Sequence, residues 1–203
     1  MRVTVFVEGG GRGISLIACR RGFQELLQKV AGETLELRVT VCGSRSNTFR
    51  DFKNALGNSD VGLALLLVDS EAPVAEGRNG WEHLSALQAD QWTRPDGATL
   101  DSAHLMVQCM ETWLLADMKA LQQHFGPAFR VSSLPKARNL EAISPKNVLD
   151  HLKRAAEPTP KNDYHKTRDG FPLLLLIDPK EIRARSLHAE RFFQKLEECA
   201  ATP

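Results

Sequence analysis

Hydrophobic residues in the first seventy positions follow the two-residue period of β-strands in three places. Residues 2–7 form a short β-branched run, and residues 35–41 alternate strictly between apolar and polar side chains. Residues 61–68 are almost continuously apolar, as expected for a strand that is covered on both faces. The pattern therefore predicts three strands, with residues 35–41 at or near a sheet edge and residues 61–68 in a central position.

Helices are predicted between these strands. Apolar residues recur at helical spacing over residues 15–30, and Thr48 is placed to cap a second helix that ends near Leu56. Because strands and helices alternate, the sequence predicts βαβ crossovers and an α/β fold with a Rossmann-like, mostly parallel open sheet and helices on both faces. In such sheets ligands bind at the carboxyl ends of the strands.

The middle of the chain is predicted to be a loop insertion followed by another crossover unit. Residues 70–102 are polar and rich in proline, glycine and tryptophan, with a short helix expected at residues 81–84. This segment is the best candidate for a flexible or substrate-facing loop. Residues 104–107 then resemble a strand, and apolar spacing predicts a helix over residues 110–124.

Residues 144–203 are expected to form a C-terminal extension of the same domain. Ser144 and Pro145 have the residue types favoured at the N-cap and the first position of a helix. The apolar run at residues 173–177 predicts a last strand, and residues 189–199 predict an amphipathic helix. The whole chain, residues 1–203, is thus interpreted as a single domain.

Composition limits what this domain can be. Its 203 residues, 42% of them hydrophobic, can bury one sizeable core. The 26 basic and 25 acidic side chains leave a net charge of +1, so any basic surface must be local. Four scattered cysteines indicate neither a zinc site nor a disulfide framework. The chain shows no signal-peptide pattern and no apolar run near the roughly 18 to 20 residues of a membrane span, which predicts a cytoplasmic protein without membrane association.

The first candidate for chemistry is Glu8, where the first strand meets a group of glycines. A sharp glycine turn leaves the carboxylate beside exposed backbone N–H groups, a setting that suits a metal ion or a phosphate. Gly9, Gly10, Gly11 and Arg12 are therefore candidate phosphate-binding residues. The segment matches neither the P-loop nor the dinucleotide fingerprint, because Ile14 and Ser15 follow Gly13. The alternative is a solvated glutamate in a glycine turn.

Asp69 and Glu71 form the second acidic feature, at the end of the central strand. Carboxylates two positions apart point to the same side of the backbone and can share one cation. Hard divalent ions prefer oxygen ligands, so Glu8, Asp69 and Glu71 are predicted to hold Mg²⁺ or Mn²⁺. The alternative is that Asp69 caps the following turn and Glu71 is simply exposed.

Together, the segments VFVEG at residues 5–9 and LLVDSE at residues 66–71 resemble the Toprim superfamily. Toprim domains occur in topoisomerases, primases and the overcoming-lysogenisation-defect nucleases. In that superfamily the glutamate and the acidic pair serve Mg²⁺-dependent phosphodiester chemistry. The usual pair is Asp-x-Asp, whereas this chain has Asp-x-Glu, so the resemblance leaves the geometry of the ion open.

The segments HLMVQCMETWLLAD at residues 104–117 and YHK at residues 164–166 narrow the resemblance. They are similar to a bacterial family of uncharacterised Toprim-like proteins that is often associated with ATPases in defence loci. This resemblance implies that Glu111 is a further acidic site residue and that Lys166 is a phosphate-facing base or charge stabiliser. On their own, Glu111 would complement a helix dipole and Lys166 would be a solvated cation.

The resemblance implies a metal-dependent nuclease that hydrolyses DNA or RNA and acts with a partner ATPase in phage defence. Its catalytic residues would be Glu8, Asp69, Glu71, Glu111 and Lys166. An alternative is a non-catalytic binding or regulatory module that docks to an ATPase, which suits the near-neutral charge better. A phosphotransfer enzyme acting on nucleotides is a third class.

Overall fold

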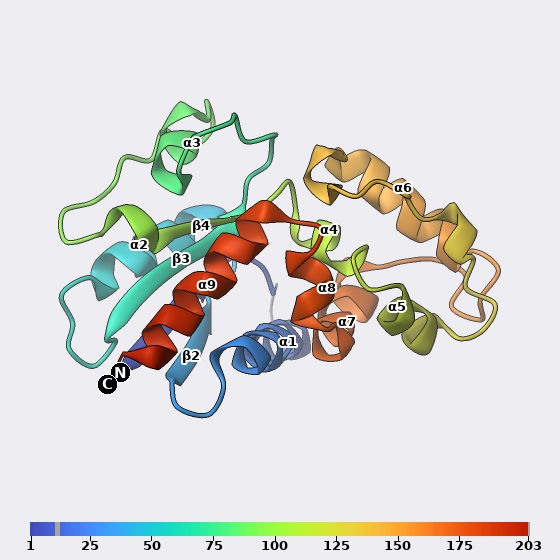
Figure 1. Cartoon of the computed structure of the whole chain (residues 1–203), viewed down its shortest axis with the longest axis horizontal. Coiled ribbons are helices and arrows are strands. Elements are labelled where there is room, and N and C mark those ends of the chain that lie inside the picture. Colours follow the sequence, from blue (N-terminus) through green and yellow to red (C-terminus); the bar gives the residue numbers. More distant parts are fainter. Residues whose placement is uncertain (11–12, 203) are drawn as a thin grey trace.

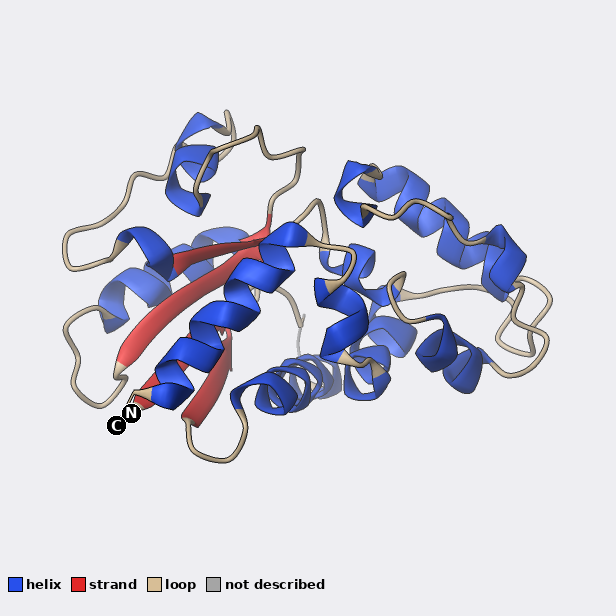
Figure 2. Cartoon of the chain, viewed as in Figure 1, coloured by secondary structure: helices blue, strands red, loops and turns tan. Residues whose placement is uncertain are grey.

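The computed structural model describes residues 1–10 and 13–202. Its strands are β1 (Arg2–Val7), β2 (Glu36–Val41), β3 (Leu63–Asp69) and β4 (Ala103–Met106). They form one parallel sheet in the order β2-β1-β3-β4 (Figures 1 and 2). The predicted α/β fold is confirmed, with β2 at an edge and β3 inside the sheet.

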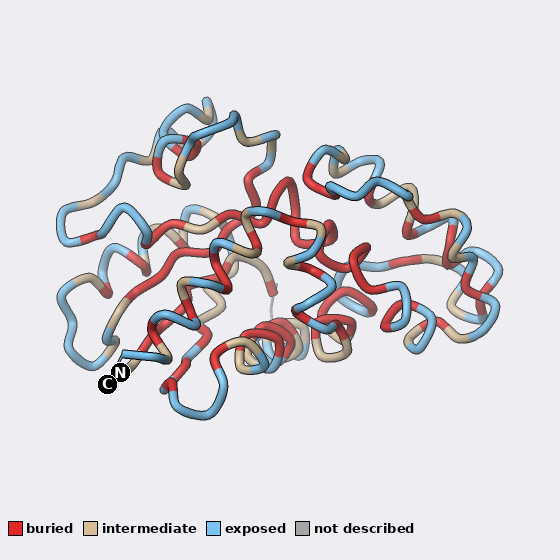
Figure 3. The backbone as a smooth tube through the Cα atoms, viewed as in Figure 1, coloured by how far each residue is buried: buried red, intermediate tan, exposed pale blue. Residues whose placement is uncertain are grey.

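Helices cover both faces of this sheet because its inner strands are apolar on both sides. Val5 of β1 faces a core with α1 (Ile14–Ala31) and α9 (Leu187–Ala201), whereas its neighbour Phe6 faces a second core with α2 (Arg45–Ala55) and α3 (Gly80–Ala86). The inner strands β1 and β3 are accordingly buried over almost their whole length, whereas the edge strand β2 has exposed residues between buried ones (Figure 3). The buried sheet provides a rigid frame for the residues at its carboxyl edge.

The remaining helices lie to one side of the sheet, at the right of Figure 1. They are α4 (Met110–Leu114), α5 (Met118–Phe125), α6 (Pro145–Ala156), α7 (Phe171–Leu176) and α8 (Pro179–Arg183). Their apolar side chains are continuous with the core beneath α1, through Trp113, Leu152 and Phe171. Ser144 caps α6 and Pro145 begins it, as predicted.

The start of α2 was predicted wrongly. Ser44 is the N-cap and accepts a hydrogen bond from the N–H of Asn47, so the helix begins before Thr48. The Thr48 hydroxyl is buried inside the helix, where it donates to the carbonyl oxygen of Ser44 at 2.9 Å. Ser44 and Thr48 are both favoured N-cap types, and the earlier residue has this role.

The single helix predicted over residues 110–124 is two helices, α4 and α5. Asp117 breaks the run, because one carboxylate oxygen accepts from the N–H groups of Lys119 and Ala120 at 3.0 Å each. Its other oxygen accepts from the N–H of Asp178 at 3.0 Å, which fixes the break against α8. An N-cap aspartate inside an apolar pattern is therefore the reason for the error.

The strand predicted at residues 173–177 is also wrong, because this run belongs to helix α7. The helix carries Pro172 in its first turn and packs closely on α1. A Cβ atom at Gly22 of α1 would lie 2.6 Å from the carbonyl oxygen of Phe171, so only glycine permits this approach. Short apolar runs cannot be assigned to strand or buried helix from their pattern alone.

The polar segment at residues 70–102 includes the expected short helix, α3. Asn79 and Glu82 form a capping box at its start, and the indole of Trp81 donates to the carbonyl oxygen of Thr99 at 2.9 Å. Across the described residues, no helix is both long and apolar enough to cross a bilayer. The four cysteines are free, as predicted.

His104 gives the fold a pH-dependent component of stability. Its ring packs on Phe192, and burial lowers the pKa of His104 from 6.5 to about 4. The folded state therefore binds a proton less readily than the unfolded state. We expect this contribution to be complete above pH 6.5 and to be lost toward pH 4, by on the order of 3 kcal/mol. Denaturant unfolding between pH 6.5 and pH 4 should show a smaller loss of unfolding free energy in His104→Leu than in the wild type. Equal losses in the two proteins would contradict this role of His104.

Candidate metal centre

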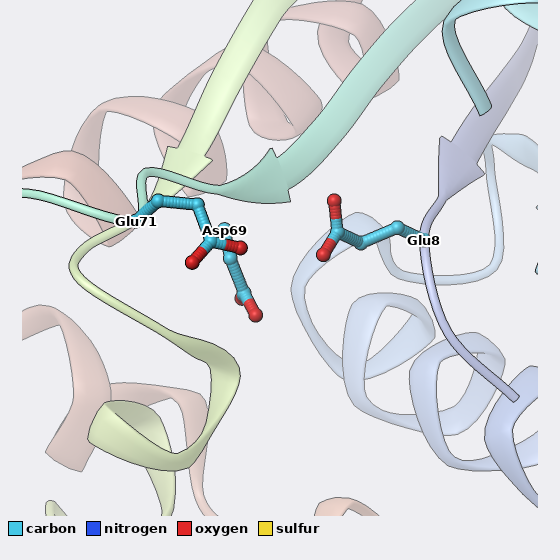
Figure 4. Close-up of side chains that lie close together, drawn as sticks. All are labelled: Glu8, Asp69 and Glu71. Atoms are coloured by element: carbon cyan, nitrogen blue, oxygen red, sulfur yellow. The ribbon is translucent and has the colours of Figure 1, made fainter. Parts of the chain in front are cut away.

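Three carboxylates meet at the carboxyl edge of the sheet. Glu8 directly follows β1, Asp69 is the last residue of β3, and Glu71 lies two positions further on. Each offers an oxygen, and these three oxygens lie within 4.8 Å of one another (Figure 4). Because β1 and β3 are adjacent and parallel, with Val7 opposite Leu67, their ends meet at the same place. The structure thus brings together the three residues predicted as ligands.

The backbone after β3 sets the direction of the acidic pair. The N–H of Ser70 donates to the carbonyl oxygen of Met106 at 3.0 Å. The N–H of Glu71 donates to the carbonyl oxygen of Gln108, also at 3.0 Å. Glu71 has a φ of 59°, a left-handed conformation uncommon for a side chain of its size. This turn leaves Glu71 exposed while its carboxylate faces that of Asp69 (Figure 4).

Asp69 is the buried member of the group. Only 6% of the residue is exposed, and its Oδ1 atom is buried with no hydrogen-bond partner among the described residues. Buried polar atoms are nearly always paired, so an unpaired carboxylate oxygen needs an explanation. An oxygen ligand of a hard cation fits this description, since its partner would be the ion.

The electrostatics of the cluster favour a bound cation. Burial raises the pKa of Asp69 well above its usual value, and the carboxylates of Glu8, Glu111 and Glu71 raise it further against the effect of Lys166. Burial likewise raises the pKa of Glu8, against the opposing effect of Arg45. A divalent ion would reverse both shifts by favouring the ionised forms.

Glu111 and Lys166 lie at the same site. The Nζ atom of Lys166 is 3.5 Å from a carboxylate oxygen of Glu111 and 3.9 Å from one of Asp69. Glu111 is buried in the first turn of α4, where its other oxygen accepts from the Tyr164 hydroxyl at 3.5 Å. Burial acts to lower the pKa of Lys166, but Asp69 and Glu111 raise it overall, so this cation stays charged.

A buried aspartate holds the segment that carries Lys166. Asp169 accepts hydrogen bonds from the N–H of His165 at 2.9 Å, from the ring of His124 at 2.9 Å and from Lys161 at 3.1 Å. Arg168 pairs with the same carboxylate at 2.8 Å. Despite burial, these donors lower the pKa of Asp169, and they anchor a π-helical turn over residues 166–170.

Arg45 is a site residue that the sequence interpretation missed. Its guanidinium donates to a carboxylate oxygen of Glu8 at 2.9 Å and to the carbonyl oxygen of Asp69 at 2.6 Å. It also donates to both oxygens of Asp90, with distances of 2.7 to 3.1 Å, and lies 5.1 Å from the ring centre of Trp92. Arg45 thus ties the segment at residues 70–102 to the ends of β1 and β3.

One signal for Arg45 was present in the sequence. It lies four positions after the carboxyl end of β2, and the carboxyl ends of parallel strands meet at one edge. The same rule that selected Glu8 and Asp69 also applied to this position. Asp90 had no such signal, because it lies in a long segment whose path depends on tertiary contacts.

The glycines predicted to bind phosphate are described only in part. The N–H of Gly9 donates to the carbonyl oxygen of Gly43 at 2.8 Å, so this donor is already used. Gly10 has a φ of 91° and lies between α1 and β2. The predictions for Gly11 and Arg12 fall outside the described residues.

Comparison with known proteins identifies a family but no activity. No curated protein and no solved structure matches the chain. One family, described as "Domain of unknown function (DUF4276)", matches residues 7–197, a range that includes the whole acidic cluster, Arg45 and Lys166. The chain therefore belongs to the DUF4276 family.

Proposed function

We propose that this protein is a divalent-metal-dependent nuclease that hydrolyses phosphodiester bonds in DNA or RNA. The ion would be Mg²⁺ or Mn²⁺, held by Glu8, Asp69 and Glu71. The observation that carries the proposal is the meeting of these three carboxylates beside the cationic Lys166, together with an Oδ1 atom of Asp69 that is buried and has no hydrogen-bond partner within the described part of the chain. The resemblance to Toprim domains supports the choice of phosphodiester chemistry.

The charges of the site support a divalent cation. Among the described residues, five carboxylates gather around two cations, Arg45 and Lys166. Four of them, Glu8, Asp90, Asp69 and Glu111, pair with these cations, and the fifth, Glu71, belongs to the three-carboxylate group. The excess negative charge is partly buried, where isolated charges are costly. The three-carboxylate group has oxygen ligands alone, which suits Mg²⁺ or Mn²⁺ better than Zn²⁺.

The side chains around the carboxylates have distinct roles in this proposal. A bound divalent cation would polarise a phosphate oxygen and lower the pKa of a coordinated water. Lys166 is half exposed, so its Nζ atom can donate to a non-bridging phosphate oxygen and stabilise the charge that develops there. Glu111 orients Lys166, and Tyr164 in turn donates to Glu111.

A partner ATPase and a role in phage defence are part of the same proposal. Both rest on the resemblance to the Toprim-like family. The near-neutral net charge is compatible with a protein that needs a partner to reach its target. Cleavage should therefore be measured both with the protein alone and with an ATPase encoded beside it.

The direct test is cleavage of plasmid, single-stranded DNA and RNA with Mg²⁺ or Mn²⁺ and with a chelator. We expect metal-dependent cleavage that falls roughly ten- to a hundredfold in Glu71→Gln, because one ligand charge is lost while the shape is kept. Glu71 is exposed, so folding should be unaffected. Glu76→Gln, an equally exposed change in the same segment, is the matched control and should keep full activity.

Two outcomes would count against this function. Equal cleavage by Glu71→Gln and the wild type would remove Glu71 from the proposed site. No cleavage of any substrate, with or without the ATPase, together with no change in melting temperature on adding metal, would favour a non-catalytic binding module.

A further inference from the structure

A groove of about 660 Å³ runs between α1 and the edge strand β2. One end of it lies at the carboxyl edge of the sheet, where its lining residue Val41 is paired with Val7, the residue before Glu8. A Cβ atom on Gly10 would be 2.8 Å from the Val41 side chain and 3.2 Å from the backbone of Leu16, and both of these residues line the groove. Gly10 is two positions after Glu8, so a ligand in the groove lies next to the segment that carries a metal ligand.

The groove is basic although the protein as a whole is nearly neutral. Arg20 and Arg21 of α1 and Arg38 of β2 line it and are exposed, and Glu25 is the one acidic residue among the described residues that line it. Among the described residues, none of these arginines has an ion pair, whereas the partly exposed Arg2, for example, pairs with Glu36 at 2.7 Å. Unpaired guanidinium groups are donors only and suit phosphate oxygens.

The free edge of β2 does not favour a peptide strand as the occupant. The side-chain amide of Gln24 donates to the carbonyl oxygen of Leu37 at 3.0 Å and accepts from the N–H of Val39 at 2.9 Å. These are backbone groups that an added strand would need for pairing. Because α1 already satisfies them, strand addition would have to displace Gln24.

We propose that this groove binds the sugar-phosphate backbone of a nucleic-acid strand next to the metal centre. The inference rests on the proposed function and names the surface that holds its substrate. Arg20, Arg21 and Arg38 donate to phosphates, and the exposed side chain of Ile17 lies among them as an apolar contact for sugars. Contacts of this kind position a strand without reading its sequence.

The test is fluorescence anisotropy of labelled single-stranded DNA, duplex DNA and RNA, in chelator so that binding is measured without cleavage. We expect Arg20→Glu/Arg21→Glu to weaken binding of the preferred strand at least about tenfold. Loss of two phosphate contacts should also make the salt dependence shallower, by about 1.4 in log–log slope for a single strand and about 1.8 for duplex DNA. The control is Lys153→Glu/Arg154→Glu, the same charge change at exposed positions of α6. It should bind like the wild type.

Thermal unfolding of both double variants checks that they fold. Unchanged binding by folded Arg20→Glu/Arg21→Glu, equal loss in the control, or no binding by the wild type would overturn the proposal. Loss of a dimer in light scattering, with oligonucleotide binding intact, would assign the groove to a second copy instead. Failure of the proposed function is seen separately, as cleavage that does not depend on metal or on Glu71.

Discussion

Asp69→Asn is expected to lower metal-dependent cleavage on the order of a thousandfold or more, the scale of loss when a central charged group of an active site is removed. Asp69 is the most buried of the three carboxylates, and its Oδ1 atom has no hydrogen-bond partner in residues 1–10 and 13–202. The change keeps the side chain's shape but removes the charge that an ion needs. Cleavage by the two purified proteins, measured over a range of Mg²⁺ and Mn²⁺ concentrations, gives this result directly.

The same substitution should not destabilise the metal-free protein. Burial raises the pKa of Asp69, and the neighbouring carboxylates of Glu8, Glu111 and Glu71 raise it further because they repel its charge. A neutral asparagine removes this repulsion, while Lys166 keeps its contact with Glu111. Adding Mg²⁺ should raise the melting temperature of the wild type and leave that of Asp69→Asn unchanged.

Asp60→Asn is a matched control, because Asp60 is exposed just before the amino end of β3. It should keep both the cleavage rate and the response to Mg²⁺. A Mg²⁺-induced rise in melting temperature that is the same in Asp69→Asn and in the wild type would place the ion elsewhere. The candidate metal centre would then be wrong even if the protein cleaves nucleic acid.

The strands of the sheet could be predicted because the order of apolar and polar side chains along each strand matches the faces that it buries. The alternation at residues 35–41 and the apolar run at residues 61–68 correspond to the edge strand β2 and the inner strand β3. The wrong predictions of secondary structure occur where tertiary contacts determine whether a segment is a strand or a helix. The apolar run at residues 173–177 became helix α7 because it packs against α1 at Gly22, a partner about 150 residues away.

The candidate site likewise contains residues that the sequence could predict and residues whose positions depend on tertiary contacts. Glu8, Asp69 and Glu71 follow from the rule that parallel strands end at one edge, and they do lie together. Glu111 and Lys166 came from resemblance, and the structure places them beside Asp69. Asp90 could not be found from the sequence, because its pairing with Arg45 depends on how a long polar segment folds back over α2, whereas the strand-end rule could have selected Arg45.

Arg45→Met should destabilise the protein by roughly 3 to 5 kcal/mol, the range for removing one partner of a buried ion pair. Arg45 is the counter-charge of two largely buried carboxylates, Glu8 and Asp90, at 2.9 and 2.7 Å. Without it, both carboxylates would be left desolvated and without this counter-charge. Denaturant unfolding at neutral pH measures the loss.

Arg50→Met on the same helix is the matched control. Arg50 pairs with Asp51 at 2.9 Å, but its side chain is 60% exposed, and exposed ion pairs contribute at most about 1 kcal/mol. A second comparison isolates the buried charge of Asp90. If that uncompensated charge causes the loss, Asp90→Asn should restore part of the stability in the Arg45→Met background, although it should destabilise the wild type. Destabilisation by the same amount in both backgrounds would show that Arg45 and Asp90 act independently, and Arg45 would then no longer explain how residues 70–102 are held at the carboxyl edge of the sheet.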